Sequence, residues 1–255
     1  LDPIPLAPRP KPPVVPSTRL IEKTEPAIVT LLNVYDSLLP VPEGTEITAL
    51  RVVQVYPKAT PDTIVPRLGH SAILYNDQNG RGSLGTVPVE ADGSASFLLP
   101  PGKPVYFQAL DANGLVVQSM RSATYAVPGA MRLTCQGCHE RRYRAPRPQA
   151  VMPQAMMRAP SELAPEADGS APLSFARLIQ PILDARCANC HQGNGQAFSL
   201  SQGNYQSDPD RFYTSYRNLE PYLSYHDYPY DFGPARTTPG EFGARTSRLY
   251  PMLAA

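Results

Sequence analysis

The cysteines carry the most specific chemistry in this sequence, because they occur only inside two copies of the pattern C-x-x-C-H. The chain has 255 residues and 4 cysteines, and the two copies use all of the cysteines. The residues that form the pattern are Cys135, Cys138, His139, Cys187, Cys190 and His191. Two thiols at this spacing attach to the two vinyl groups of one porphyrin, and the histidine that follows lies under the iron. The pattern therefore predicts two covalently bound c-type haems.

Two other kinds of site use the same residue types. A Cys/His zinc site is one alternative, and a pair of disulfides is the other. A four-cysteine zinc site would use both pairs of thiols, but it would not need a histidine after each pair. Haem attachment accounts for the histidines as well as the thiols.

Charge and hydropathy restrict the class of protein. The formal net charge is +1, which gives no case for nucleic-acid binding. No apolar run is long enough to cross a membrane. The chain begins at Leu1 rather than at a methionine, which indicates a mature or internal product. Because haem c is attached after export, we expect a periplasmic, extracellular or organelle-lumen location.

The elements that must position the two motifs begin with a proline-rich strap, residues 1–26. Its prolines are Pro3, Pro5, Pro8, Pro10, Pro12, Pro13, Pro16 and Pro26. Such a sequence favours polyproline II over helix or central strand. We expect the strap to be extended and to contact an assembly partner or an upstream domain.

Residues 27–150 are expected to form an antiparallel β-sandwich that carries the first haem. Short apolar stretches alternate with turn signals through this region, among them Asp92-Gly93 and Asn113-Gly114, which are hairpin-type turns. Residues 80–85 match G-x-G-x-x-G by letter but open no predicted helix, so they are interpreted as a turn.

Residues 151–172 are expected to be a linker, and residues 173–255 a small helical or irregular cytochrome c-like unit with the second haem. Ser174 is a candidate N-cap, and Pro181 should kink or restart the helix after it. That helix is predicted from apolar residues at helical spacing, namely Phe175, Leu178, Ile179, Ile182 and Leu183. The linker methionines are Met152, Met156 and Met157, for which interface packing is favoured over iron ligation. No closing helix is predicted before Ala255, so we expect a truncated domain.

Several stretches in this order resemble one family. They are Leu-Asn-Val-Tyr-Asp at 32–36, Leu-Gly-Thr-Val-Pro-Val-Glu at 84–90, Tyr-Phe-Gln-Ala-Leu-Asp at 106–111, Gln-Ser-Met-Arg-Ser-Ala-Thr-Tyr at 118–125, Cys-Gln-Gly-Cys-His-Glu at 135–140, Ile-Gln-Pro-Ile-Leu at 179–183, the second motif at 187–191, and Thr-Pro-Gly-Glu-Phe-Gly at 238–243. The chain resembles the middle and C-terminal haem domains of the hydrazine synthase alpha subunit family over most of residues 28–253. In that family a β-propeller precedes these domains, and we expect none within residues 1–255.

The resemblance implies an unusual iron ligand at the first haem. Tyr143 matches the family tyrosine that binds the iron while the motif histidine turns aside to zinc. Tyr143 lies four residues after His139, so both share one face if a helical turn follows the motif. The flanking arginines, Arg141, Arg142 and Arg144, would favour the ionised phenol. Either Tyr143 or His139 alone binds this iron in our prediction, and its other face stays open.

The second iron is expected to have two strong ligands. His191 is the first, and the resemblance implies a second histidine beyond the end of this chain. Within the chain, His226 is the candidate for that role, and His70 of the β unit is a weaker one. Zinc at the first motif and calcium at Asn76, Asp77 and Asn79 are weaker alternatives for further metals.

From these observations the sequence favours electron transfer by a dihaem c-type cytochrome outside the cytoplasm, with a redox protein or like subunits as partners. The alternative is a redox enzyme subunit that acts on a small nitrogen compound at the first haem, as in hydrazine synthase. A weaker alternative is a structural subunit of an extracellular cytochrome assembly. The sequence assigns no catalytic residue.

Overall fold

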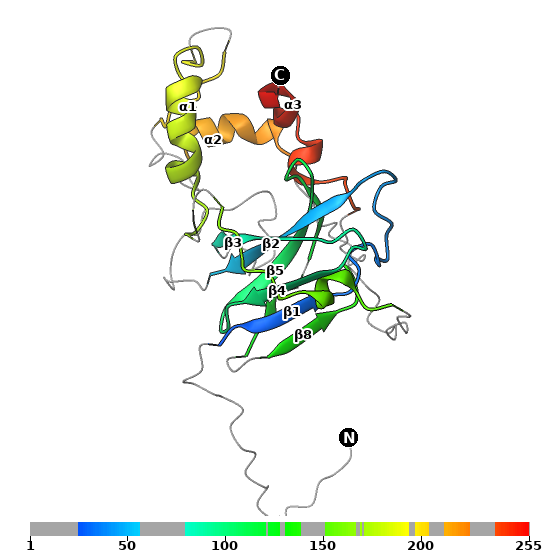
Figure 1. Cartoon of the computed structure of the whole chain (residues 1–255). Coiled ribbons are helices and arrows are strands. Elements are labelled where there is room, and N and C mark those ends of the chain that lie inside the picture. Colours follow the sequence, from blue (N-terminus) through cyan, green and yellow to red (C-terminus); the bar gives the residue numbers. More distant parts are fainter. Residues whose placement is uncertain are drawn as a thin grey trace, which may run out of the picture.

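The computed structural model is rich in β-structure, with two sheets facing each other and short helices grouped at one end (Figure 1). It describes residues 25–56, 80–120, 122–127, 131–138, 151–166, 169, 171–193, 197–203, 212–224 and 238–254. The expected β-rich class with few helices is therefore confirmed. The proline-rich strap lies outside the described residues, apart from Glu25 and Pro26.

The strands form two sheets of different size. The smaller sheet has the order β4-β1-β8, and the larger has the order β3-β2-β5-β6, with β7 paired to β5. The bounds are β1 Ala27–Leu31, β2 Ile47–Val55, β3 Arg81–Pro88, β4 Ala95–Leu99, β5 Pro104–Asp111, β6 Val116–Ser119, β7 Thr124–Tyr125 and β8 Arg132–Cys135. Most pairs are antiparallel, as expected, but β1 and β8 run parallel.

One apolar core holds the two sheets together. Its buried side chains include Val29, Phe97 and Leu99 of the smaller sheet and Leu50, Val52, Val105 and Val117 of the larger sheet. Phe97 is fully buried, and its ring meets that of Phe107 edge-on with the centroids 5.5 Å apart. Burial of these alternating apolar residues is the main stabilising contribution to the sandwich.

The two predicted hairpin turns have different outcomes. Asn113-Gly114 joins β5 to its antiparallel partner β6, and the Asp111 carboxylate accepts from the N–H groups of Asn113 and Leu115 at 2.9 Å each. That hairpin is confirmed. At Asp92-Gly93 the tight turn is present, because Gly93 N–H donates to the Glu90 carbonyl at 2.8 Å, but it joins β3 of the larger sheet to β4 of the smaller sheet, so these strands do not pair as a hairpin. An Asp-Gly pair fixes a tight turn but not which strand pairs with which.

The interpretation of residues 80–85 as a turn was also wrong, because most of them lie in strand β3. The glycines serve close packing instead. A Cβ on Gly82 would lie 2.6 Å from the carbonyl oxygen of Ala171, and one on Gly85 would lie 2.4 Å from that of Ala164. Both distances are too short for a side chain, so glycine lets Ala164 and Ala171 lie against the strand.

The described part of the expected linker, residues 151–166, 169, 171 and 172, lies across the sandwich, and we call these residues the crossing segment. Ser161 donates to the carbonyl of Ser96 at 2.8 Å and accepts from Leu98 N–H at 2.9 Å. Thr86 and Ala164 exchange two backbone hydrogen bonds of 2.8 and 2.9 Å. The crossing segment is thus bonded to the outermost strand of each sheet, β4 and β3.

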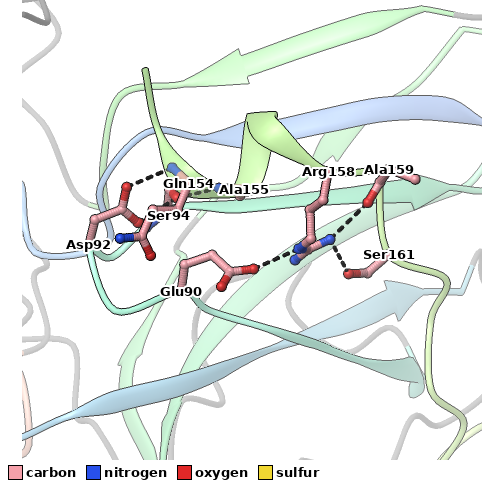
Figure 2. A network of polar contacts seen from close by, with 8 residues as sticks. All are labelled: Glu90, Asp92, Ser94, Gln154, Ala155, Arg158, Ala159 and Ser161. Carbon is pink, nitrogen blue, oxygen red and sulfur yellow. Dashed lines mark hydrogen bonds and ion pairs between the residues drawn. The ribbon is translucent and has the colours of Figure 1, made fainter. Parts of the chain in front are cut away.

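Polar side chains fasten the start of the crossing segment (Figure 2). The Asp92 carboxylate accepts from Gln154 N–H at 2.8 Å and from the N–H and hydroxyl of Ser94. Arg158 Nε donates to Glu90 Oε1 at 2.7 Å, and its Nη1 donates to the Ala159 carbonyl and the Ser161 hydroxyl. The three linker methionines beside this network are all exposed.

The helical unit follows the crossing segment. Its helices are the π-helical η2 Phe175–Ile179, α1 Gln180–Arg186, α2 Thr214–Leu219, the 3-10 turns η4 Glu220–Tyr222 and η5 Gly243–Thr246, and α3 Leu249–Ala254; another 3-10 turn, η1 Gln154–Met157, precedes them. Ser174 caps η2 by accepting from Arg177 N–H at 3.3 Å, so its predicted role is confirmed. The helix restarts as α1 at Gln180, next to Pro181, as expected.

The helical unit has a small core and a contact with the sandwich. Its buried residues are Leu183, Leu200 and Leu219. Gly240 donates to the Val117 carbonyl at 2.8 Å, and Arg245 pairs with Asp111. A closing helix was not expected, but the described chain ends in α3. In the part of the chain that the structure describes, no helix is long and apolar enough to cross a lipid bilayer.

Candidate haem-attachment sites

Strand β8 delivers the first cysteine pair. Leu31 of β1 lies opposite Cys135, the last residue of β8, in a parallel ladder. The ladder continues past the strand, because Leu32 N–H donates to the Cys135 carbonyl at 2.9 Å and Asn33 N–H to the Gln136 carbonyl at 3.0 Å. The first half of the motif is therefore held as sheet, not as helix.

Asp36 holds the second half of the first motif. Its carbonyl accepts from Cys138 N–H at 3.1 Å, and its carboxylate accepts from Gln136 Nε2 at 2.7 Å. A Cβ on Gly137 would lie 1.9 Å from the Asp36 carbonyl oxygen. Glycine is therefore required between the cysteines of this motif for a steric reason, since any side chain would push the two segments apart.

Both cysteines of the first pair line one apolar cavity of about 280 Å³. The lining residues are Val29, Leu31, Leu50, Phe97, Phe107, Met120, Ser122, Cys135, Gly137 and Cys138. The cysteines are half-buried and pack against the sandwich core. Two thiols that share one apolar cavity suit the apolar, vinyl-bearing edge of a porphyrin, so the residues present fit the predicted group.

Helix α1 delivers the second pair. Cys187 follows the last helical residue and donates its N–H to the Leu183 carbonyl at 2.9 Å. Cys190 and His191 both donate to the Cys187 carbonyl, at 3.2 and 3.0 Å, so the motif forms one compact turn. Cys190 is exposed, and so are Ile179 and Ile182 of the preceding helices. The second motif is thus far more open than the first.

Phe198 holds the ring of His191 from one side. The Nδ1 atom of His191 lies 3.3 Å from the Phe198 carbonyl oxygen, and the two rings are in contact with centroids 5.1 Å apart. A carbonyl can only accept, so this hydrogen bond places the proton on Nδ1 and leaves the Nε2 lone pair for a metal. The donor set and its outer partner fit the proximal ligand of a haem.

The other predicted ligands lie outside the described residues. These are His139, Tyr143, His226 and His70, as well as the calcium candidates Asn76, Asp77 and Asn79. Within the described ranges, no cluster of three or more His, Cys, Asp or Glu side chains is placed to hold a metal ion. The structure describes all four cysteines and joins none of them in a disulfide.

Sequence reasoning missed Asp36, the steric role of Gly137 and the contact between His191 and Phe198. Asp36 is 100 positions from Gln136, so no local pattern links them. Gly137 did carry a signal, because a glycine between the cysteines of one motif but not of the other indicates different surroundings.

Comparisons with known proteins agree with one another. The family of the hydrazine synthase alpha subunit middle domain matches residues 45–140. Hydrazine synthase subunit alpha of Kuenenia stuttgartiensis is 27% identical over an alignment of 209 residues, and the match covers 58% of this chain and 26% of that protein. The solved structure of Kuenenia stuttgartiensis hydrazine synthase superposes with a TM-score of 0.59 at 22% identity, and the match covers 79% of this chain and 34% of the solved chain.

These matches have clear bounds. The chain spans about a quarter of the length of the curated relative, 26%. The structural match establishes a shared fold. The family match includes Cys135 and Cys138 and ends at residue 140, so the second cysteine pair lies beyond it.

Proposed function

We propose, from the premise that this chain is hydrazine synthase alpha-like, that it is the haem-bearing part of a redox enzyme subunit. One observation carries the proposal. The family match covers residues 45–140, and at its end the structure places Cys135 and Cys138 on one apolar cavity. The comparisons thus favour the enzyme alternative over the electron carrier that the sequence alone favoured.

The first site is the proposed place of reaction, with a small nitrogen compound as substrate. Cys135 and Cys138 would hold the first haem, and the apolar cavity beside them would exclude water from the porphyrin edge. When bound, the haem supplies one-electron redox chemistry at iron. His139 or Tyr143 would be the iron ligand on one side, which leaves the other side for substrate.

The second site is proposed to pass electrons to or from the first. Cys187 and Cys190 would hold the second haem, with His191 as its proximal ligand and His226 as the candidate for the other face. The exposure of Cys190 and the hydrogen bond from His191 to Phe198 support this role, because they combine access for a partner with a fixed ligand.

The proposal extends to partners and location. The curated relative is named as one subunit of hydrazine synthase, which favours like subunits or a redox protein as partners. Attachment of haem c outside the cytoplasm supports a periplasmic or extracellular site of action. Zinc and calcium remain weaker alternatives for further metals.

The test is a matched pair of double variants in the full chain. One carries Cys135→Ser with Cys138→Ser, and the other carries Cys187→Ser with Cys190→Ser. The intact mass of the parent should exceed the polypeptide mass by two haems, and each variant should lose one. Binding of nitric oxide or cyanide should disappear in the first variant and persist in the second.

Three results would contradict the proposal. A parent without covalent haem would exclude both haem sites. If nitric oxide or cyanide binding is lost in the Cys187→Ser, Cys190→Ser variant instead, the second site would be the place of reaction and the first would carry electrons. A dihaem parent that binds neither ligand would leave only the electron carrier.

A further inference from the structure

Three consecutive backbone carbonyls beside the second motif each accept a hydrogen bond from a different side chain. The Phe198 carbonyl accepts from His191 Nδ1 at 3.3 Å. The Ser199 carbonyl accepts from Asn218 Nδ2 at 2.8 Å, and the Leu200 carbonyl accepts from Gln180 Nε2 at 3.1 Å. Leu200 N–H also donates back to the His191 carbonyl at 2.9 Å. Residues 198–200, which we call the carbonyl clamp, are therefore held from α1, from α2 and from His191 itself.

Gln180 is unusually well fixed for a polar residue. It is only 4% exposed, and its amide is fully used. Nε2 donates to Leu200 and also to Asp184 at 2.8 Å, while Oε1 accepts from the Ser215 hydroxyl at 2.5 Å. A buried amide is stable only when its groups are paired, and here the pairing spans α1, α2 and the clamp.

The clamp acts on the face of His191 that is turned away from a metal. A hydrogen bond from Nδ1 to a carbonyl fixes the ring and makes Nε2 a better electron donor. A stronger donor stabilises ferric over ferrous iron and lowers the reduction potential. The strength of this hydrogen bond depends on where the Phe198 carbonyl is held, and Gln180 and Asn218 hold the two carbonyls next to it.

We propose that Gln180 and Asn218 are positioning residues that lower the reduction potential of the second haem by holding the carbonyl clamp against His191. This inference rests on the proposed attachment of haem to Cys187 and Cys190. It assigns a tuning role to two residues that lie outside the C-x-x-C-H motif.

The experiment uses the full dihaem chain and near-isosteric variants without a donor, Gln180→Met and Asn218→Leu. The midpoint potential of the second haem is measured by redox titration and assigned with the Cys135→Ser, Cys138→Ser variant. We expect each variant to shift the ratio of oxidised to reduced haem about tenfold toward reduced, which is about 59 mV upward for a one-electron couple. Thr246→Val is the matched control, because it removes a hydrogen bond to Ser224 in the same unit without touching the clamp.

The outcomes distinguish an effect of Gln180 and Asn218 on the reduction potential from an effect on stability alone. A potential that rises in both clamp variants and not in Thr246→Val supports the inference. Variants that keep the haem, melt at a lower temperature and keep the parental potential would overturn it, because the residues would then be merely structural. If Gln180→Met fails to fold, Asn218→Leu alone decides, since Asn218 is only partly buried. A parent without haem on Cys187 and Cys190 would overturn this inference together with the proposed function, whereas an unchanged potential overturns this inference alone.

Discussion

The same five-letter motif is presented by two different scaffolds in this chain. The first copy starts at the end of strand β8, shares a ladder with β1 and lies against the large core between the sheets. The second copy follows helix α1 and rests on a core of three leucines. C-x-x-C-H therefore predicts the chemistry of a site but not the structure around it.

The difference between the two sites is consistent with the separate roles proposed for them above. The first site is lined mostly by apolar side chains, which would suit the proposed reaction because they keep water from its surroundings. The second is open at Cys190, which is what electron exchange with a partner needs. The following variants test whether the sandwich and the helical unit respond separately to substitution. They are given in order of decreasing expected effect.

Removal of a large core side chain should damage only the first scaffold. Phe97 is fully buried and lines the cavity beside the first cysteine pair. Phe97→Ala should cost about 3–5 kcal/mol of unfolding free energy, because it leaves a cavity in a rigid core. Amide hydrogen exchange should rise throughout the sandwich and little in the helical unit.

The counterpart in the second scaffold is Leu219→Ala. Leu219 belongs to a core with few buried neighbours, so we expect a loss of about 2 kcal/mol, the low end for a leucine. Exchange should rise around α1 and α2 only. Equal changes in both units after either substitution would show that the two scaffolds unfold as one.

The residue between the cysteines should matter at the first motif and not at the second. Gly137→Ala places a Cβ 1.9 Å from the Asp36 carbonyl, so we expect a loss of about 1–3 kcal/mol and lower occupancy of the first haem. Asn189 holds the equivalent position in the second motif and is exposed, so Asn189→Ala should change stability by less than about 0.5 kcal/mol. Full haem occupancy in Gly137→Ala would contradict the steric argument.

Much of the fold followed from local sequence. Alternating apolar stretches predicted a β-rich chain, Asn113-Gly114 predicted a hairpin, and Ser174 predicted a helix start. Each of these is decided by neighbours in the chain, which is why sequence alone sufficed.

The features that escaped prediction depend on distant contacts. Gly82 and Gly85 looked like turn residues, but they are glycines because the crossing segment lies over them. Asp92-Gly93 was predicted to join two paired strands, but β3 before it lies in the larger sheet and β4 after it lies in the smaller sheet. The first site could be predicted only as two thiols and a histidine, because its cavity and its bond to Asp36 arise from segments far apart in sequence.

Acid should loosen the crossing segment that runs between the two scaffolds. Burial by itself raises the pKa of Asp92, but hydrogen bonds from Gln154 N–H and from the hydroxyl and N–H of Ser94 outweigh it and hold the pKa below the usual 3.8. The stability that these bonds provide is therefore complete above pH 3.8 and is lost as the pH falls through the lowered value.

The matching measurement compares the parent with Asp92→Asn in urea at several pH values. Asp92→Asn should be less stable than the parent at neutral pH, because the NH2 group of asparagine replaces one of the two carboxylate oxygens that accept hydrogen bonds. The difference in unfolding free energy between the two proteins should shrink on acidification. A difference that stays constant with pH would show that the ionised carboxylate is not what fastens the segment.

The smallest effect is expected at the contact between the helical unit and the β5–β6 hairpin. Arg245 pairs with Asp111, and both side chains are partly shielded from solvent. Arg245→Met should lower stability by about 1 kcal/mol or less, because partly exposed ion pairs contribute little. Differential scanning calorimetry should show the helical unit affected first. A loss of several kcal/mol would mean that the two scaffolds depend on each other.

The crossing segment also affects how copies of this chain can associate. The outward-facing backbone groups of a sandwich's last strands readily recruit a strand from another molecule, which is a common route to aggregation. Here Ser161 pairs with Ser96 and Leu98 of β4, and Ala164 pairs with Thr86 of β3, so the crossing segment covers part of each of these edges. A strand from another copy cannot bond at these points while the crossing segment is in place, so cutting the crossing segment should increase aggregation.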